Sequence, residues 1–391
     1  MQVDATLSSC ALRLFFCMLV LTLGAAHAEE CEPDVTAVTS IGRVVYDGST
    51  VAPGRMLRLD FAEPDQRLRY VRLLLRPSPP TGSSWQLIVR DARLRIIDML
   101  LHDHEPGALG FWTRRLYGSG PLYLDLAAES SQTRISVVRA IVMPEEAQHP
   151  YYSIQTPGVY AYSPLYEAPT ETRRLGDHVG FLIASWGTKS WCCSGVAVGE
   201  DLFLTNWHCG GDNLAMQPHG FWSQQVCEST FVDFSWDGDG VDREFTCVAV
   251  LDKDETNDYA LLRLRPLRGT DRLRAPALRR QAPRADESLQ IVHHPACQLK
   301  QISRACTVRD PKVEGWRSGA GDDFTYPCDT ERGSSGAPVF DQSNRLLGIH
   351  HLGFQKKGDR CDMLNKAVGL QGVLGAMRQE YADRLRALMR D

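Results

Sequence analysis

The first part of the chain consists of short apolar runs interrupted by clusters of turn-forming residues. Proline, glycine and serine separate the runs at residues 77–82 and 118–121, and no long helical period intervenes. Short apolar runs between such breaks are typical of β-strands. The runs are residues 56–59, 71–75, 85–89, 122–126 and 135–142. This pattern predicts an all-β sandwich or jelly roll for the first domain.

A second domain is predicted beyond a proline-containing stretch. Prolines recur between residues 144 and 170 among tyrosines and polar residues, a composition typical of an extended linker. Strand patterns resume at residues 179–184, and a mixed apolar and charged pattern at 372–389 predicts one terminal helix. We therefore expect an N-terminal accessory domain at 29–145, a linker at 146–170 and a second β domain at 171–391.

Residues 1–28 are predicted to be a secretory signal. Arg13 precedes an apolar run at residues 14–26, and residues 26–28 (Ala-His-Ala) fit a small-residue cleavage site. The alternative is an uncleaved membrane anchor, but the run is shorter than the ~20 residues that span a bilayer. We expect a secreted mature chain without a membrane span, and the sequence leaves open whether it is periplasmic or extracellular.

Cysteine content and charge narrow the class of protein further. The chain has 12 cysteines, of which Cys10 and Cys17 lie in the predicted signal, so 12 − 2 = 10 remain. An even number of cysteines in an exported chain indicates disulfides. The net charge of -5 and the pI of about 6.1 provide no basic field of the kind that binds nucleic acid.

Three segments of the second domain carry residues suited to acyl transfer by a serine. This chemistry needs an imidazole to take the hydroxyl proton, a carboxylate to orient the imidazole, and backbone donors for the oxyanion. Two strand-like runs lead to His208, Asp258 opens the apolar run of residues 259–264, and Ser335 lies in the Gly-Ser-Ser-Gly-Ala-Pro segment at 333–338.

Together these segments resemble the trypsin and chymotrypsin family over residues 175–391. The resemblance implies a two-barrel fold in which His208 is the general base, Asp258 orients it and Ser335 is the nucleophile. It also implies that the amides of Gly333 and Ser335 form the oxyanion hole. The order His, Asp, Ser along the chain is that of the family.

The same resemblance implies a Cys193–Cys209 disulfide, because a half-cystine follows the histidine directly in the family. One departure concerns Ser334, which stands where animal trypsins have an aspartate that pairs with a new N-terminal amine. We expect the site to form without that switch. The Gly-Ser-Ser-Gly form and residues 292–295 are similar to bacterial lysyl and glutamyl endopeptidases. Residues 29–170 are thus expected to be an accessory domain, although Arg173-Arg174 offers a processing point.

Asp329 is the candidate for primary specificity. It lies six residues before Ser335, the position that lines the base of the pocket in trypsin-like enzymes. A pocket carboxylate left without a cation is costly, so Asp329 favours substrates with Lys or Arg. The alternative is a structural aspartate that caps a turn.

An alternative interpretation of the primary substrate specificity is based on residues 347–353. Matching Gly353 to the family's glycine puts His350 where glutamyl endopeptidases bind a substrate carboxylate, with Thr330 able to assist. His351 then stands where the family usually has a serine. We prefer the basic specificity, because Asp329 would repel an acidic side chain if it points into the pocket.

Neither a metal nor another cofactor is expected. His293, His294, Cys297 and Cys306 could form a zinc cluster, but exported cysteines usually oxidise. Proximity along the chain suggests the remaining disulfides as Cys227–Cys247, Cys297–Cys306, Cys328–Cys361 and Cys31–Cys192.

The leading hypothesis is a secreted serine endopeptidase that acts on proteins or peptides, with a first domain that binds a protein, a glycan or a surface. A second hypothesis is a non-catalytic binding protein that keeps the fold as a scaffold. A third, an esterase of the α/β-hydrolase type, requires Gly-x-Ser-x-Gly and the order Ser, Asp, His, and this chain has neither.

Overall fold

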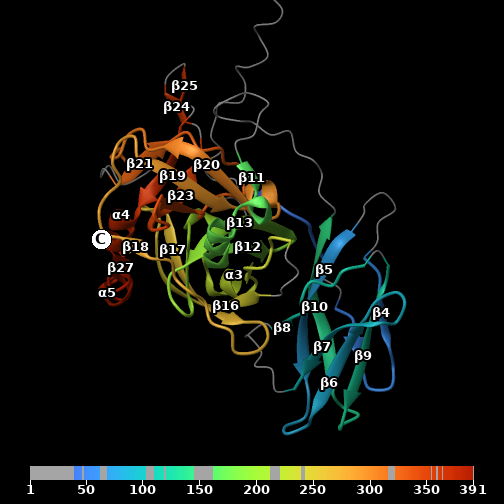
Figure 1. The fold of residues 1–391 in the computed structure, drawn as a ribbon. Coiled ribbons are helices and arrows are strands. Elements are labelled where there is room, and N and C mark those ends of the chain that lie inside the picture. The colour runs from blue at the N-terminus through green and yellow to red at the C-terminus, as the bar shows by residue number, and fades with distance from the viewer. Residues whose placement is uncertain are drawn as a thin grey trace, which may run out of the picture.

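The computed structural model describes two β-rich domains that follow each other along the chain. The described residues are 39–45, 48–61, 68–102, 110–118, 120–144, 162–211, 221–238, 243–315, 322–353, 355–357, 360–362 and 364–390. The predicted signal and most of the predicted linker lie outside them. Figure 1 shows the first domain in blue and teal and the second in green to red.

The first domain contains two antiparallel sheets. The strands of one sheet follow the order β2-β10-β5-β8, with β3 also on β10, and those of the other follow β4-β9-β6-β7. The first sheet comprises β2 (Arg43–Val45), β3 (Thr50–Val51), β5 (Leu68–Ser78), β8 (Phe111–Trp112) and β10 (Arg134–Pro144). The second comprises β4 (Leu57–Leu59), β6 (Trp85–Arg90), β7 (Ile96–Leu101) and β9 (Leu122–Ala128).

Alternating burial explains why these runs form strands around one core. In β6, Trp85, Leu87 and Val89 are buried, whereas the residues between them are only partly buried. Both sheets contribute to one hydrophobic cluster, to which β5 gives Leu73 and β10 gives Val137. The prediction of a mostly β chain is confirmed, and the jelly-roll topology of this domain stays a prediction.

Six strands of the second domain close into a barrel. The order β13-β12-β15-β16-β17-β14 returns on itself because β14 also pairs with β13. The strands are β12 (Val179–Trp186), β13 (Lys189–Ala197), β14 (Leu202–Thr205), β15 (Phe231–Asp233), β16 (Glu244–Asp254) and β17 (Tyr259–Pro266). Phe234 packs edge-on against Phe203 and Phe245 inside it. β1 (Thr39–Ser40) extends this sheet by pairing with β13.

A nine-stranded sheet forms the rest of the second domain. Its main path is β11-β20-β19-β22-β23-β18-β27, and β26 joins β23 to β21. The strands are β11 (Tyr162–Pro164), β18 (Leu278–Arg279), β19 (Ser288–His293), β20 (Gln301–Thr307), β21 (Asp323–Tyr326), β22 (Pro338–Asp341), β23 (Leu346–Leu352), β26 (Asn365–Gly369) and β27 (Met389–Arg390). A separate hairpin consists of β24 (Gln355–Lys357) and β25 (Arg360–Asp362).

The helices are short and connect the strands or follow them along the chain. They are the α-helices α2 (Thr170–Arg173), α3 (Gln224–Glu228), α4 (Leu370–Ala376) and α5 (Gln379–Arg386), and the 3-10 helices η1 (Leu165–Glu167), η2 (Arg174–His178), η3 (His208–Gly210) and η4 (Pro295–Cys297). Within the described part of the chain, no helix is both long and apolar enough to cross a membrane.

One prediction about element boundaries is wrong. The single helix expected at 372–389 is two helices, because Met377 is extended and the backbone amide of Arg378 donates to the Asp252 carboxylate at 2.7 Å. Within the predicted linker at 146–170, Tyr162–Pro164 is extended and pairs with β20, and the linker itself stays a prediction.

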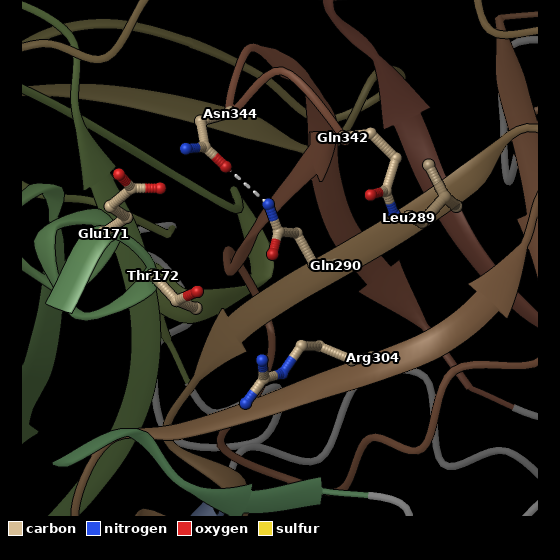
Figure 2. A pocket seen from close by; sticks show the side chains of 7 residues that line it. All are labelled: Glu171, Thr172, Leu289, Gln290, Arg304, Gln342 and Asn344. Carbon is tan, nitrogen blue, oxygen red and sulfur yellow. Dashed lines mark hydrogen bonds between the residues drawn. The ribbon is translucent and has the colours of Figure 1, made fainter. Parts of the chain in front are cut away.

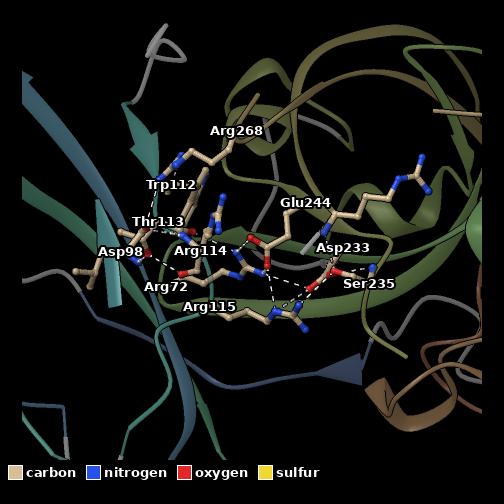
Figure 3. Close-up of polar contacts among 12 residues, drawn as sticks. Arg72, Asp98, Trp112, Thr113, Arg114, Arg115, Asp233, Ser235, Glu244 and Arg268 are labelled. Atoms are coloured by element: carbon tan, nitrogen blue, oxygen red, sulfur yellow. Dashed lines mark hydrogen bonds and ion pairs between the residues drawn. The ribbon is translucent and has the colours of Figure 1, made fainter. Parts of the chain in front are cut away.

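The two domains share a buried interface. The guanidinium of Arg72 on β5 reaches the carboxylates of Glu244 at 2.5 Å and Asp233 at 3.3 Å, and Arg115 approaches the same two groups (Figure 3). An apolar cluster with members from both domains surrounds this network; it includes Tyr70, Trp112, Ile141, Phe181, Phe231 and Trp236. The first domain is therefore packed against the barrel in this structure.

Candidate active site

Strand pairing brings His208 and Asp258 together. His208 opens η3 just after β14, Asp258 stands just before β17, and β14 pairs with β17 through Thr205 and Ala260. The Nδ1 of His208 lies 2.8 Å from Oδ2 of Asp258, and the backbone amide of His208 donates to Oδ1 at 3.0 Å. Both side chains are buried, so the carboxylate holds the imidazole in one orientation.

Asp258 is held ionised in this buried position. Burial alone raises its pKa, but the charge and hydrogen bond of His208, together with His351, outweigh burial and lower the pKa to about 2. Its backbone has φ of 45°, and Asn206 donates to its carbonyl at 2.9 Å. Asn206 was not predicted as a site residue, since only the folded chain shows this contact.

The Ser335 loop is fixed from both sides by backbone and side-chain hydrogen bonds. The amide of Ser194 donates to the Ser335 carbonyl at 2.8 Å, and the Ser194 hydroxyl donates to the Gly333 carbonyl at 2.9 Å. Gly333 has φ of 96°, and a Cβ there would lie 2.6 Å from the His294 carbonyl oxygen. Gly336 has φ of 84°, so glycine is required at both places. Ser335 itself is half-buried.

The Cys193–Cys209 disulfide lies between the histidine and the serine loop. Sγ of Cys209 is 3.8 Å from the Ser335 carbonyl oxygen, and a ring nitrogen of His208 lies within 4.8 Å of both sulfurs. The three predicted catalytic residues thus converge on one region, between the barrel and the nine-stranded sheet.

Some predicted disulfide pairings are wrong. The structure contains Cys227–Cys247, but it pairs Cys192 with Cys297 and Cys306 with Cys328. The expected pairs Cys297–Cys306, Cys328–Cys361 and Cys31–Cys192 therefore do not form. Cys31 and the side chain of Cys361 lie outside the described residues. Distance along the chain misled the prediction, because folding brings β13 against η4 across 105 residues.

The considered zinc cluster does not fit these cysteines. Cys297 and Cys306 are both oxidised, so they offer no thiolate. The close group Cys193, His208 and Cys209 has the same difficulty, because its two sulfurs are bonded to each other.

A chain of hydrogen bonds supports the loop in front of Ser335. Ser334 accepts from the amide of Glu331 at 3.1 Å and contacts Nδ1 of His293 at 2.7 Å, while Ser303 contacts Nε2 of His293 at 3.2 Å. Ser303 donates its own proton to the Asp329 carbonyl. Its oxygen must therefore accept from Nε2, which leaves Nδ1 to accept from Ser334. Burial lowers the pKa of His293 to about 3, consistent with this neutral ring.

The candidate specificity residues are all near this loop or on β23. Asp329, Thr330, His350 and His351 are buried, and Gly353 is partly buried. Nδ1 of His350 lies 2.8 Å from the hydroxyl of Tyr326. Burial, with the neighbouring imidazole of His351, keeps the pKa of His350 well below its usual value, so this ring is neutral.

Glu331 is an acidic neighbour that the sequence did not single out. Burial raises its pKa to about 7, the hydroxyl of Tyr162 lowers it by donating a hydrogen bond at 2.8 Å, and the charge of Asp329 raises it. The charge of Asp329 therefore acts on Glu331 just before Ser335.

A polar surface pocket lies elsewhere on the second domain. Figure 2 shows its lining, in which Gln290 donates to Asn344 at 2.6 Å; the lining residues are Glu171, Thr172, Leu289, Gln290, Arg304, Gln342 and Asn344. None of these seven residues belongs to the predicted site. The pocket is therefore separate from the region of His208 and Ser335.

The class of the second domain follows from its sequence match. Residues 193–349 match a family model described as a trypsin-like peptidase domain. This segment contains His208, Asp258 and Ser335, and the match supports a trypsin-like peptidase.

The individual proteins that match this chain have low sequence identity to it. The Secreted RxLR effector protein 73 of Plasmopara viticola is 27% identical over 197 residues, which cover 48% of this chain and 48% of that protein. The chain thus spans about half the length of this curated relative. The active form of the Rv3671c protease from M. tuberculosis aligns with a TM-score of 0.41 and 15% identity, covering 60% of this chain and 92% of that one. An inactive form of that protease aligns with a TM-score of 0.38 and 16% identity, covering 52% and 89%.

Proposed function

We propose that the chain is a serine endopeptidase in which Ser335, His208 and Asp258 cleave peptide bonds. The observation that carries this proposal is the fixed pair of His208 and Asp258 beside the hydrogen-bonded loop of Ser335. The trypsin-like match over residues 193–349 supports the same reaction class.

The proposed reaction has two halves. His208 takes the proton of Ser335 as the hydroxyl oxygen attacks the peptide carbonyl, and then gives that proton to the leaving amine. Water attacks the acyl-enzyme in the second half, again with His208 as base, and releases the acid and free Ser335. Asp258 stays ionised and stabilises the imidazolium, while the amides of Gly333 and Ser335 hold the oxyanion.

We further propose that the site forms without a new N-terminal amine. Ser334 occupies the place of the aspartate that animal trypsins use, and its hydroxyl is held by neutral His293 and by the Glu331 amide. These contacts join residues of the chain as it stands. The loop therefore needs no cleavage to acquire its partners.

For primary specificity we propose cleavage after Lys or Arg. Asp329 and Glu331 place two carboxyl groups near each other, and neutral His350 adds no positive charge to balance a substrate carboxylate. A cationic side chain is therefore the better electrostatic match.

Cleavage after Glu is the second candidate, and one contact favours it. The Tyr326 hydroxyl lies 2.8 Å from Nδ1 of His350 and 3.4 Å from the Lys366 carbonyl oxygen. With its one proton directed at the nearer nitrogen, the proton of the His350 ring lies on Nε2 and can bind a substrate carboxylate. Release assays with Lys, Arg or Glu before the scissile bond distinguish the two, with Asp329→Asn as the variant. Loss of Lys and Arg cleavage in Asp329→Asn supports the basic specificity. Efficient cleavage only after Glu rejects it.

Labelling with a fluorophosphonate probe tests the reaction class. We expect the full chain to be labelled and Ser335→Ala to remain unlabelled while it melts at the same temperature. Ser343→Ala is a matched control, because it removes an exposed hydroxyl in the turn between β22 and β23 and leaves the Ser335 loop untouched. A folded wild-type chain that takes up no label would favour the non-catalytic scaffold instead.

Export and the role of the first domain are parts of the same proposal. The four disulfides among the described residues suit an oxidising compartment, and the matched relative is described as secreted. We propose that the first domain stays attached as an accessory domain that binds a protein or a glycan.

A further inference from the structure

A second histidine contacts Asp258 from the nine-stranded sheet. His351, near the end of β23, has Nδ1 at 3.3 Å from Oδ2 of Asp258 and Nε2 at 3.0 Å from Oδ2 of Asp323. The contact to Asp323 is a hydrogen bond, whereas the one to Asp258 has the distance of an ion pair without hydrogen-bond alignment. At most 2% of each of these three side chains is exposed.

This geometry favours a charged ring. A neutral imidazole has one N–H, so one nitrogen of His351 would direct its lone pair at a carboxylate oxygen away from water. An imidazolium carries a proton on each nitrogen, so it donates to Asp323 and attracts Asp258 by its charge. Other titratable groups near it are His208, beyond Asp258, His350, on the same strand, and Tyr326, on β21 with Asp323.

Electrostatics agrees with the geometry. Burial alone lowers the pKa of His351, but Asp323 and Asp258 raise it more, to about 9. The positive charge also lies close to the proposed base. Because the nitrogens of His208 and His351 are 2.8 and 3.3 Å from the same oxygen of Asp258, they are at most 2.8 + 3.3 = 6.1 Å apart.

We propose that His351 is a positioning residue that acts through Asp258, and that Asp323 fixes it there as an imidazolium. This inference rests on the proposed peptidase function. The charged ring holds the carboxylate at the same oxygen that His208 contacts, and it shares the negative charge of that group. Because the ring shares the negative charge of Asp258, that carboxylate stabilises a protonated His208 less than it would beside the neutral serine usual in the family.

The rate of fluorophosphonate labelling against pH tests this role. The variant is His351→Gln combined with Asp323→Asn, which removes the imidazolium together with its counter-ion and leaves no lone buried carboxylate. Asp323 contacts the far nitrogen of the ring, so the imidazolium is the nearer of the two lost charges to Asp258, and the acid limb of the profile should rise by about half a pH unit. His102→Gln, at an exposed position of the first domain, is the control and should not shift it. A folded double variant with an unchanged acid limb would overturn the inference.

Histidine resonances of the wild-type full chain give a readout that needs no activity. We expect the His351 imidazole to stay protonated beyond about pH 8, whereas titration near the ordinary value of about 6.5 would overturn the inference. If the chain is not labelled at all, the peptidase proposal fails, but this titration still decides the charge of His351. The titration of His351 in the wild-type chain also tests the inference if the double variant does not fold.

Discussion

Arg72 provides the sharpest test of how the two domains hold together. Its side chain is fully buried, donates to both oxygens of Glu244 and to Asp233, and lies over the ring of Phe231 at 4.2 Å. Arg72→Ala leaves two buried carboxylates with Arg115 as a shared cation. Removing one member of a buried ion pair costs about 3–5 kcal/mol, and the remaining Arg115 places this case near about 3 kcal/mol.

Urea unfolding followed by tryptophan fluorescence measures this loss, because Trp112 and Trp236 lie in the interface. Arg58→Ala is the matched control: its pair with Asp60 at 2.9 Å is 60% and 46% exposed, so we expect less than about 1 kcal/mol. Adding Glu244→Gln to Arg72→Ala should recover part of the loss by removing one unpaired charge. If Arg72→Ala is as stable as Arg58→Ala, the interface does not depend on this network.

The remaining predictions concern the loop and the linker. His293→Ala should slow fluorophosphonate labelling by at least about tenfold at unchanged probe affinity, because Ser334 loses the acceptor that fixes the loop; equal labelling rates would contradict this. Glu331→Gln should reduce the dependence of the free energy of unfolding on pH. Burial raises the pKa of this carboxyl from 4.5 to about 7 in the folded chain, so its contribution to stability is complete below about pH 4.5 and is lost as the pH rises to about 7. In thermal melts the wild type should lose stability over this range, and the variant should not. After cleavage at a protease site inserted between residues 150 and 155, both fragments should elute together in gel filtration at moderate salt; separation without denaturant would contradict permanent docking.

Local patterns predicted the parts of the site that depend on neighbours in sequence. The strand-like runs before His208 and after Asp258 form β14 and β17, and the pairing of these strands places the two residues together. The glycines at 333 and 336 do adopt the left-handed backbone that the motif requires. In each case a short segment carries enough information, because strand pattern and turn chemistry are local properties.

The contacts that sequence reasoning missed all join distant segments. Asp323 follows a run rich in glycine and aspartate, where a solvated loop is the natural interpretation, and its contact with His351 exists only because β21 and β23 both pair with β26. The pairing of Cys192 with Cys297 likewise requires two elements to meet across 105 residues. A local sequence pattern does not predict contacts between segments so far apart in the chain.

The same disulfide joins the domain interface to the proposed active site. Cys192 and Cys297 belong to the apolar cluster that both domains share, and a Cβ on Gly333 would lie 3.1 Å from Sγ of Cys192. The first domain thus packs against the Cys192–Cys297 disulfide, which in turn contacts the Ser335 loop at Gly333. Close-packed interiors transmit displacement, so loosening the interface should also loosen Gly333. The first domain is then part of the structure that supports the proposed active site. We expect the rate of fluorophosphonate labelling of Arg72→Ala to fall together with its free energy of unfolding.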